Sequence, residues 1–510
     1  MGQEKSDRRI VPKKDSNASG GKATTVSKQP KQLQLFETTA ECPQGANACV
    51  DNSQLLSTRS EVPKVSTKEG NVLAAMVMEE IANDDNLRTA FNNVQRNQGA
   101  PGPNRQTIKD VENHIDELLP AIRQLLLDGS YRSGMIRRVW IPKPGGGSRG
   151  LGIPDVIDRW VQQATYQVLS PHFDTTFHES SHGFRPGRSC HTAIAEAAGY
   201  LEEGYGIVVD LDLEKFFDQV NHQRLLARLS QRIADKRVLI LIHRMLKAKA
   251  VMPDGVIVRT EEGVPQGGPL SPLLSNIVLD ELDQELSRRG HKFVRYADDC
   301  NIYVRSQRAG ERVMISISKF IVKRLRLKVN TAKSAVAPPA ERHFLGFRLD
   351  VNPMTMEVSI HLSERSKRRI DEKIRLLTPR NWGGSIRSCI KRINRYLRGW
   401  IGFFWICTKE ELRVLSALSA HIRRRLRAMI LKDWKCKRTI VKRLIKCGVS
   451  RRLAWRTLYK ERRRLWALSH CPAVDRGMNN AYFAKLSLIS LPVEWEQKWA
   501  KHTAIAQLDS

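Results

Sequence analysis

The sequence has no uninterrupted apolar run that approaches the roughly 18 to 20 residues needed to span a bilayer. Its first residues, MGQEKSDRRIVPKKDS, lack the apolar core of a secretory signal peptide. The nine cysteines are scattered, and none forms the C-x2-C pair that is typical of a zinc site. These absences argue against a membrane protein, a secreted protein and a zinc module, and they favour a cytosolic protein with reduced thiols.

Acidic residues are also scarce, because 53 Asp and Glu stand against 85 Lys and Arg and leave a formal net charge of +32. Solubility requires far less charge than this. The surplus therefore predicts a polyanionic partner, either nucleic acid or an anionic membrane surface. Residues 381–470 contain 25 Lys or Arg and 4 Asp or Glu, so 25 − 4 = +21 of the charge is concentrated in 90 residues. Aromatics are interleaved with this charge and predict stacking surfaces beside phosphate contacts.

The composition changes twice along the chain. Residues 1–66 are rich in Lys, Ser, Gln, Thr and Asn with few aromatics, which predicts a disordered basic extension. From about residue 70 to about 357, strand-like and helix-like segments alternate irregularly, as in an α+β domain. After about residue 360 the strand signals almost vanish, and the chain becomes helical and very basic.

Two adjacent carboxylates interrupt an apolar stretch, FVRYADDCNIYV, at residues 293–304. The charges of Asp298 and Asp299 repel each other, and apolar flanks strengthen the repulsion unless a cation lies between them. Strand alternation would send the two side chains to opposite faces. We therefore predict a hairpin in which FVRY pairs with CNIYV and the doublet lies at the tip.

A second strand-like segment, IVVDLDLEKFFD, carries Asp210, Asp212 and Asp218 and supplies a third carboxylate. Few-carboxylate sites suit Mg²⁺, which prefers octahedral oxygen coordination and keeps water and substrate phosphate as ligands. Two such ions, about 3.5–4 Å apart, activate an attacking 3′-hydroxyl and stabilise a leaving pyrophosphate. An Asp doublet alone is a weak signal, so the inference depends on the combination.

These residues resemble those of a known family. YADD at 296–299 matches the Y-x-D-D box of reverse transcriptases, and DLEKFFD at 212–218 matches the aspartate box that precedes it. GVPQGGPLSPLLSNI at 263–277 is similar to the loop that positions template and nucleotide in those enzymes. IPKPGGGSRGLGIP at 141–154 and HGFRPGRSCHTA at 182–193 resemble the fingers blocks of group II intron reverse transcriptases, also called maturases.

The resemblance continues toward the C-terminus. LKVNTAKSAV followed by FLGF at 344–347 resembles the closing block of the palm. INRYLRGWIGFF at 393–404 and HIRRRLRAMILKDWK at 421–435 are similar to the maturase thumb and the DNA-binding region after it. The blocks follow the family's order from about residue 70 to about residue 495, which is more than four-fifths of the chain.

The resemblance implies a right-hand polymerase fold in four parts. These are the extension at 1–66, fingers and an antiparallel palm sheet at 67–357, a helical thumb at 358–432 and a small basic helical DNA-binding domain at 433–510. It implies an RNA-directed DNA polymerase that also binds group II intron RNA, assists its splicing and copies it into DNA during retrohoming. The implied partners are that RNA, an RNA template with a DNA primer, target DNA and dNTPs, in the bacterial cytoplasm near the nucleoid and not at a membrane.

The resemblance also assigns roles in the reaction. Asp212, Asp298 and Asp299, with the Leu213 carbonyl, would bind two Mg²⁺ ions. Lys333 would protonate the leaving pyrophosphate as a general acid, or else be a solvated lysine. The residues implied in nucleotide binding are Lys143, Arg149, Leu213, Phe217, Gln266 and Gly267.

Phe217, two glycines and Asp210 each have a stated reason or an alternative. Phe217 would collide with a 2′-hydroxyl and so exclude ribonucleotides, or else be a core aromatic. Gly267 and Gly268 would let backbone approach the primer–template junction, where side chains would block it. Asp210 would be a solvent contact at the strand end, although it faces the same side as Asp212 and could compete with it.

Seven arginines are implied in nucleic-acid binding: Arg185, Arg188, Arg395, Arg398, Arg423, Arg424 and Arg425. For Arg185 and Arg188, the alternative is that they brace the fingers. Two departures from the family pattern lie outside the metal site, GPNR at 102–105 in place of G-x-D-G and His182 in place of an aromatic residue. They put template contacts in question and leave the catalytic prediction intact.

The sequence shows no cysteine pairs and no H-N-H site of the endonuclease that many relatives carry. The resemblance is therefore to the class C members, which lack that domain and prime at nicks or nascent strands. Two other functions stay open. One is an RNA-binding splicing factor with an idle polymerase site, and the other is a host-adopted reverse transcriptase used in DNA repair or defence.

Overall fold

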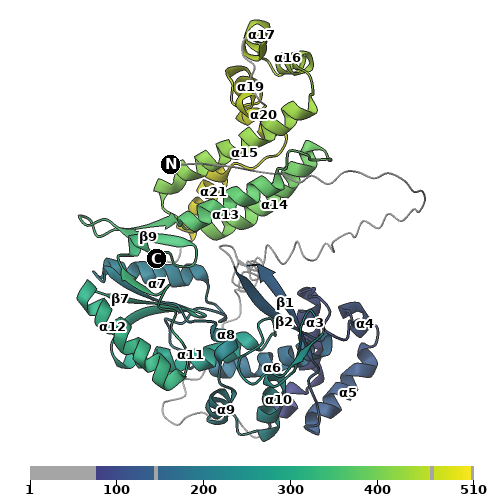
Figure 1. The fold of residues 1–510 in the computed structure, drawn as a ribbon, viewed down its shortest axis with the longest axis vertical. Coiled ribbons are helices and arrows are strands. Elements are labelled where there is room, and N and C mark those ends of the chain that lie inside the picture. Colours follow the sequence, from purple (N-terminus) through teal and green to yellow (C-terminus); the bar gives the residue numbers. More distant parts are fainter. Residues whose placement is uncertain (1–75, 143–146, 460–464, 507–510) are drawn as a thin grey trace, which may run out of the picture. The chain divides into compact units, whose positions relative to one another are not determined.

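The computed structural model describes residues 76–142, 147–459 and 465–506. Helices alternate with three small sheets up to Leu362, and the described chain after that residue is helical (Figure 1). The predicted α+β class is therefore confirmed. The predicted disordered extension, residues 1–66, and Lys143 lie outside the described residues. None of the described helices is long and apolar enough to cross a membrane.

The described chain begins with helices packed around α6. Asn83 caps α3, because its side chain accepts a hydrogen bond from the Asp85 N–H at 2.9 Å. α3 then packs Phe91 against Trp160 of α6, with ring centroids 5.0 Å apart. The Trp160 indole N–H donates to the Leu87 carbonyl at 2.6 Å. These helices are α2 (Val77–Ile81), α3 (Asp84–Arg96), α4 (Ile108–Glu112), α5 (Ile115–Leu127) and α6 (Val156–Asp174).

The first sheet has the strand order β2-β1-β4-β5. β1 and β2 form an antiparallel hairpin in which Ile141 lies opposite Arg149, while β4 runs parallel to β1. The four strands are β1 (Ile136–Pro142), β2 (Ser148–Pro154), β4 (Ala250–Val251) and β5 (Ile257–Val258).

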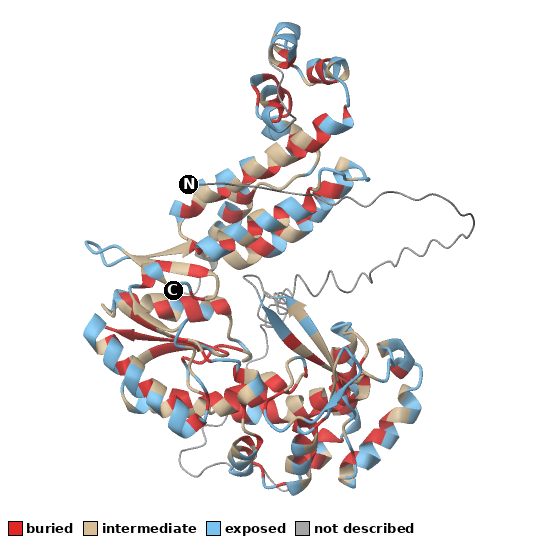
Figure 2. Ribbon diagram, viewed as in Figure 1, coloured by how far each residue is buried: buried red, intermediate tan, exposed pale blue. Residues whose placement is uncertain are grey.

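The second sheet is antiparallel and has the order β6-β7-β3-β8, as predicted for the palm. Its central strand β7 is buried from Cys300 to Val304 (Figure 2). Alternate residues face opposite layers, so Val209 and Ile302 join the core with α11 and α12, while Val208 and Tyr303 join the core with α7. The elements are β3 (Ile207–Leu211), β6 (Lys292–Tyr296), β7 (Asp299–Val304), β8 (Ala335–Ala337), α7 (Cys190–Glu202), α11 (Ser271–Arg288) and α12 (Gln307–Phe320).

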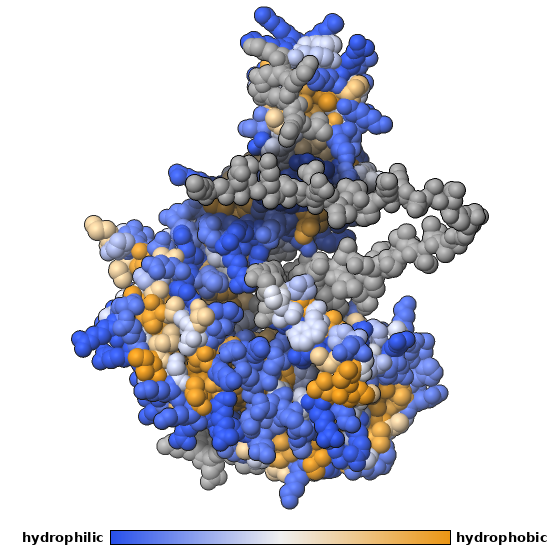
Figure 3. All heavy atoms as spheres, in the orientation of Figure 1, coloured by the Kyte–Doolittle hydropathy of each residue, from blue (hydrophilic) through white to orange (hydrophobic). Residues whose placement is uncertain are grey.

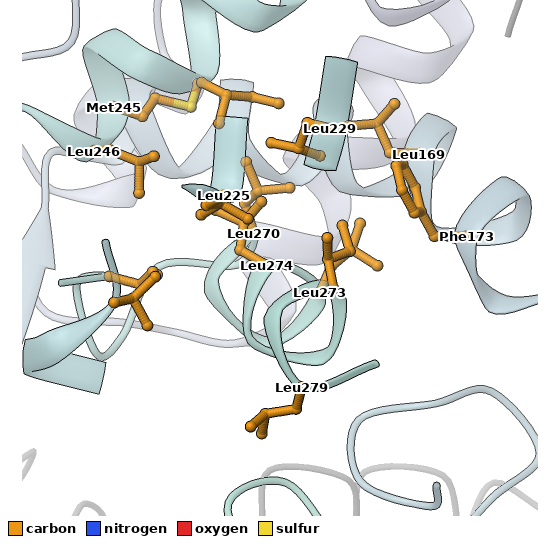
Figure 4. Close-up of a cluster of buried hydrophobic side chains, with 14 of the residues drawn as sticks. Leu169, Phe173, Leu225, Leu229, Met245, Leu246, Leu270, Leu273, Leu274 and Leu279 are labelled. Carbon is orange, nitrogen blue, oxygen red and sulfur yellow. The ribbon is translucent and has the colours of Figure 1, made fainter. Parts of the chain in front are cut away.

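A single apolar core joins α6, α9, α10 and α11 (Figure 4). Leucines dominate it, as Figure 4 shows for Leu225, Leu229, Leu273 and Leu274, and all four are buried. This core gives the loop before α11 a rigid base. The shorter elements of this region are α8 (Phe216–Gln219), α9 (His222–Ser230), α10 (Lys236–Leu246), η1 (Ile321–Leu325) and η2 (Pro339–Glu341).

A hairpin of β9 (Phe347–Val351) and β10 (Val358–Leu362) leads into the helical half. It crosses the predicted boundary at 357/358. Three long helices follow, as predicted for the thumb: α13 (Glu364–Leu377), α14 (Ile386–Phe404) and α15 (Leu412–Asp433), with η3 (Lys409–Glu411) before α15. The interleaved tryptophans of this region, Trp400 and Trp434, are only 8% and 7% exposed. Trp400 and Trp434 are core residues, so the prediction of stacking surfaces is wrong for these two, whereas Phe403, Phe404 and Trp405 are half-buried.

The helices after α15 do not all form a separate C-terminal unit. α21 returns to pack against α14 and α15. Asn394 of α14 donates to the Ser487 carbonyl and accepts from the Ile489 N–H, which fixes the segment before α21. The helices are α16 (Lys437–Lys446), α17 (Arg451–Tyr459), α18 (Leu465–Leu468), α19 (Pro472–Gly477), α20 (Asn480–Lys485) and α21 (Leu491–Ala506).

Candidate active site

The Asp doublet lies in a tight turn between β6 and β7. Tyr296 pairs with Asp299, so Ala297 and Asp298 form the turn, and Asp299 is the first residue of β7. Ala297 has φ 57°, a left-handed conformation that reverses the chain within two residues. The predicted hairpin is confirmed, and the turn overrides the pleat that would have separated the two carboxylates.

Asp212 meets the doublet through the sheet register. β3 pairs with β7 so that Leu211 lies opposite Cys300, and the next step of this register places Asp212 opposite Asp299. The main chain of Asp212 is held from the other side. Its N–H donates to Ser334 Oγ at 3.0 Å, and its carbonyl accepts from the Asn330 N–H at 2.8 Å. The three predicted metal ligands therefore come from two neighbouring strands and lie at the same end of the sheet.

The carboxylates sense one another electrostatically. Burial, together with the negative charges of Asp298, Asp210 and Asp212, raises the pKa of Asp299 to about 7. Burial also raises the pKa of Asp298, against the lowering effect of the Arg149 guanidinium. The Asp299 side chain is nevertheless exposed to solvent, so the surrounding protein desolvates it without closing off a path for ions.

The donors fit magnesium in chemical type. Asp212 Oδ2 is buried and has no hydrogen-bond partner, and the cation nearest to it, Lys333 Nζ, lies at 3.4 Å. Leu213 and Val329 form an isolated antiparallel β-bridge. Its two hydrogen bonds use the Glu214 N–H and the Asp212 carbonyl, so the Leu213 carbonyl takes part in neither of them. Among the described residues, no three His, Cys, Asp or Glu side chains are already assembled around one point. The strand register therefore brings the carboxylates near one another, but the described side chains are not arranged around one metal position.

A buried arginine orients the turn. Arg295 of β6 is 0% exposed, and its Nη1 donates to the carbonyl of Ala297 at 2.9 Å and to Asn276 Oδ1 at 3.0 Å. Its Nε donates to Asp283 Oδ1 at 2.7 Å, and its Nη2 donates to Ser181 Oγ at 2.6 Å. The guanidinium thus ties α11, the loop at Ser181 and the Asp298 turn together.

Gly183 packs directly against the same turn. A Cβ on Gly183 would lie 2.2 Å from the Ala297 nitrogen, so only glycine fits there. The adjacent His182 is buried, with Nε2 2.6 Å from Glu196 Oε2 and Nδ1 2.8 Å from Thr192 Oγ1. Both ring nitrogens of His182 are therefore engaged within the fold.

Asp210 is not a solvent contact, contrary to the sequence-based expectation. Arg342 donates to Asp210 Oδ2 from Nε at 3.0 Å and from Nη2, and the same Nη2 donates to the Lys333 carbonyl at 2.9 Å. Arg342 thus neutralises the carboxylate two residues before Asp212. It also holds the backbone of Lys333, whose side chain is 68% exposed.

The glycine-rich loop before α11 lies on β2. The Gly152 N–H donates to the Gln266 carbonyl at 2.7 Å. Gly267 has φ +122°, and a Cβ there would be 2.6 Å from the Gly152 carbonyl oxygen. A Cβ on Gly268 would be 2.3 Å from Gln162 Oε1. These glycines are required for packing on the protein itself, so their predicted role in approaching the primer–template junction is not needed to explain them.

Phe217 lies in α8, next to the loop. It is half-buried, and its ring meets Phe216 edge-on at 5.2 Å. Its carbonyl accepts from the Val264 N–H at 2.6 Å, which attaches α8 to the loop. Phe217 is therefore neither a sealed core residue nor fully exposed. Arg149 is exposed on β2 at the turn side, where its charge lowers the pKa of Asp298.

Two predicted nucleic-acid contacts are occupied by the protein. Arg185 donates to Asp174 Oδ1, Asp174 O, His178 O and Ser181 O, and only 7% of its side chain is exposed. Arg425 donates to the hydroxyl and the carbonyl of Thr378 at the end of α13. Both guanidiniums brace the fold, which for Arg185 is the alternative stated from the sequence, and which for Arg425 provides a structural role beside the predicted nucleic-acid contact.

The remaining predicted arginines differ in exposure. Arg395 and Arg398 are exposed on one face of α14. Arg423 and Arg424 are half-buried, and Arg424 lies 4.3 Å over the Trp466 ring. Arg188 is half-buried and donates to the Glu179 carbonyl at 2.8 Å. Arg395 and Arg398 therefore fit the predicted phosphate contacts best.

Sequence reasoning missed Arg295, Asp283 and Arg342. A signal for Arg295 was present, since an arginine inside the apolar strand FVRY needs a buried acidic partner. GPNR at 102–105 also has a structural explanation, because the Asn104 N–H donates to Asp155 Oδ1 at 3.1 Å.

Comparison with known proteins agrees with this geometry. Residues 141–349 match the family model for reverse transcriptase (RNA-dependent DNA polymerase), and residues 367–448 match the group II intron maturase-specific domain. Asp212, Asp298 and Asp299 lie in the first match, and Arg395 and Arg398 lie in the second.

Three relatives illustrate the likeness. Protein YkfC of Escherichia coli is 42% identical over 175 residues, covering 34% of this chain and 46% of that protein. The group II intron-encoded protein LtrA of Lactococcus lactis is 35% identical over 208 residues, covering 40% and 34%. The putative COX1/OXI3 intron 2 protein of Saccharomyces cerevisiae is 28% identical over 328 residues, covering 52% and 38%. The chain spans less than half the length of each of these relatives.

Among solved structures, a partial Cas6-RT-Cas1–Cas2 complex is similar at 25% identity. The match covers 48% of this chain and 42% of that chain, with a TM-score of 0.32. A score this low supports no inference about the present chain.

Proposed function

We propose that this chain, which carries a reverse transcriptase domain at 141–349 and a maturase-specific domain at 367–448, copies RNA into DNA and assists the splicing of a group II intron RNA. The observation that supports the polymerase proposal is the β3–β7 register, in which Leu211 lies opposite Cys300, directly before Asp212 on one strand and directly after Asp299 on the other.

The three carboxylates and the Leu213 carbonyl would hold two Mg²⁺ ions. When bound, such ions supply the charge that activates a primer 3′-hydroxyl and stabilises the leaving pyrophosphate. The protein supplies position and polarity. Arg295 orients the Asp298 turn, and the Asn330–Ser334 segment fixes Asp212.

Lys333 and Arg149 would act on the triphosphate. The Lys333 ammonium is 68% exposed and 3.4 Å from Asp212 Oδ2, so it can hold a proton beside the leaving pyrophosphate. Arg149 is exposed and close enough to Asp298 to lower its pKa, which suits a contact with a phosphate next to the metal ligands. Phe217 would exclude a 2′-hydroxyl from its half-exposed position in α8.

Extension of oligo(dT) on poly(rA) by the full chain, with dTTP and Mg²⁺, tests the polymerase proposal. We expect extension that stops when EDTA removes the metal. Failure to extend with Mg²⁺ or Mn²⁺, by a chain that still binds the template, would overturn it.

The maturase proposal rests on the second domain match and on the exposed Arg395 and Arg398 of α14. The chain would bind intron RNA in its folded form, while the RNA performs the splicing chemistry. Affinity should fall linearly with salt on logarithmic axes, because phosphate neutralisation releases counterions. A splicing assay with the RNA that flanks the gene tests this, and splicing that is equally fast without the protein at low Mg²⁺ would overturn it.

We also propose that the chain is a class C member and works near the bacterial nucleoid on target DNA. Sequencing of the gene's flanks tests both the intron origin and the alternative of a host-adopted enzyme. A gene with no intron RNA structure around it would favour that alternative.

A further inference from the structure

Two aromatic side chains stand exposed on the basic α17 helix. Trp455 and Tyr459 are 39% and 44% exposed and lie one helical turn apart. Their rings are stacked, with centroids 4.7 Å apart and an interplanar angle of 22°. By contrast, Trp434 and Trp495 in the same half of the chain are 7% and 2% exposed. The stacked pair therefore differs from these two buried tryptophans, whereas Trp466, which is 37% exposed, lies beneath the Arg424 guanidinium at 4.3 Å from its ring centroid.

The pair is not needed to attach α17 to the core. Ala454 and Leu458 do so, since both are completely buried one position before each aromatic. Gly477 of α19 packs at the same core, near Leu444 of α16. Because the helix already buries its own apolar face, Trp455 and Tyr459 are not needed to attach it, yet both expose ring surface to water.

The segment that leads up to the pair carries only cationic charges. Residues 434–459 contain nine Lys or Arg and no Asp or Glu. The Lys437 ammonium lies 5.2 Å from the Tyr459 ring centroid, and Arg452 and Arg456 are exposed on the adjacent stripe of α17. Figure 3 shows hydrophilic side chains covering most of the described surface at α16 and α17. An acidic or apolar protein partner would match only part of this surface, whereas a nucleic acid matches both its charge and its rings.

We propose that Trp455 and Tyr459 form a stacking platform for an unpaired base, and that Lys437, Arg452 and Arg456 neutralise the phosphates on either side of it. Every base offers a π-face, so the platform would bind single strands with little sequence preference. A base inside a duplex is already stacked on its neighbours and cannot reach the rings. The inference rests on the proposed function, since it names the strand type that this domain would hold during copying.

The first test must report on this site alone, because a chain with a net charge of +32 is expected to bind oligonucleotides on other surfaces too. Oligo(dT) carrying 5-iododeoxyuridine crosslinks on irradiation to an aromatic ring on which the iodinated base stacks. With the full chain, we expect crosslinked peptides that contain Trp455 or Tyr459. Crosslinks that map only outside α16 and α17 would overturn the proposal.

Affinity measurements supply the energetic test. The Trp455→Ala/Tyr459→Ala double variant should raise the dissociation constant for oligo(dT) by roughly 5- to 150-fold, the range that loss of one base stack produces. It should leave binding of an abasic oligomer of equal length unchanged. Ile445→Ala, which removes a 38% exposed apolar side chain from the neighbouring α16, is the matched control and should have no effect.

Three outcomes decide the matter. Retention of binding by Trp455→Phe, together with its loss in Trp455→Leu, supports stacking over mere hydrophobic contact. If the double variant loses as much affinity for blunt duplex as for single strands, the stacking platform is wrong. Primer extension on poly(rA) is measured on the same variants. If the chain extends primers but no crosslink forms at Trp455 or Tyr459, the stacking platform is wrong and the polymerase proposal stands.

Discussion

Arg295 and Asp283 form an ion pair in which both side chains are completely buried. The same guanidinium donates to the carbonyl of Ala297, directly before Asp298. A buried charge is tolerated only when it is paired and fully hydrogen-bonded, so this pair links the stability of the sheet to the orientation of the candidate metal ligands.

Replacing Asp283 by Leu should destabilise the folded chain by about 3–5 kcal/mol, because Arg295 would remain buried without its partner. Thermal unfolding followed by circular dichroism measures this loss. The Asp283→Leu/Arg295→Met double variant should recover part of the stability. It should still extend primers slowly, because the donor to the Ala297 carbonyl is gone. A double variant that extends at the parental rate would show that Arg295 does not position the turn.

Asp298→Asn should slow primer extension at least about 100-fold, since a lost metal ligand removes several kcal/mol of charge stabilisation from the transition state. RNA binding should stay nearly intact, because phosphate contacts elsewhere on the chain dominate affinity. Extension rates and filter binding are measured on the same preparations. Asp254→Asn, at an exposed turn, is the control and should leave both unchanged. Undiminished extension by Asp298→Asn would remove Asp298 from the metal site.

The local features of the site could be predicted from the sequence. The YADD hairpin follows from a charged doublet between two apolar strands, and the polarity pattern of IVVDL marks the strand that carries Asp212. Each of these signals lies within about a dozen residues of sequence. The pairing register of the sheet then brings the two strands together. The helical character of the chain after about residue 360 followed from its composition, whereas the thumb was implied by the resemblance.

The partners of individual arginines could not be predicted. Arg342 reaches Asp210 across 132 residues of sequence, and Arg185 saturates itself on backbone carbonyls that no pattern marks. An arginine has five N–H donors, so whether it meets phosphate or protein depends on the groups that the fold places around it. Arg395 and Arg185 have the same side chain, and only the structure distinguishes an exposed cation from a brace.

Asp158 predicts a pH-dependent stability. Burial raises its pKa to about 6, while it accepts hydrogen bonds from the Tyr131 hydroxyl at 2.7 Å and from the Gly134 N–H at 3.0 Å. Because the folded pKa lies above the ordinary value of 3.8, the folded state holds the proton more tightly, and stability falls as the pH rises from about 4 to about 6.

Asp158→Asn removes that titration. The variant should therefore gain stability relative to the parent as the pH rises from 4 to 7, by up to about 3 kcal/mol. Unfolding midpoints of both proteins across this range measure the difference, in which the other titrating groups cancel. A gap that does not change with pH would show that Asp158 titrates normally.

Phe217→Ala should admit ribonucleotides more readily, because a 2′-hydroxyl would no longer meet the ring. Single-turnover incorporation of dTTP and UTP on poly(rA) measures the discrimination, which should fall at least about tenfold if the steric contact is worth 1.4 kcal/mol or more. Phe216→Leu is the matched control. Phe216 is buried beside Phe217, so its change should lower stability and leave discrimination intact. Unchanged discrimination in Phe217→Ala would return Phe217 to a purely structural role.

Variants of Arg342 should separate an effect on Mg²⁺ binding from an effect on the maximal rate of extension. Arg342→Ala leaves the Asp210 carboxylate unpaired, on the same strand face as Asp212 and near enough to raise the pKa of Asp299. The added negative charge should lower the Mg²⁺ concentration that gives half-maximal extension. The maximal rate should nevertheless fall, because a fourth carboxylate competes for the ion and Lys333 loses the anchor on its carbonyl.

The Arg342→Ala/Asp210→Asn double variant separates these two effects. It removes the competing charge, so the Mg²⁺ requirement should return toward the parental value. The maximal rate should recover only in part, because the Lys333 backbone is still released. The non-additive term of the double-mutant cycle, measured on the Mg²⁺ midpoint, then reports the Arg342–Asp210 coupling directly. Fully additive effects on that midpoint would mean that Arg342 acts on the reaction by some route other than the carboxylate it contacts.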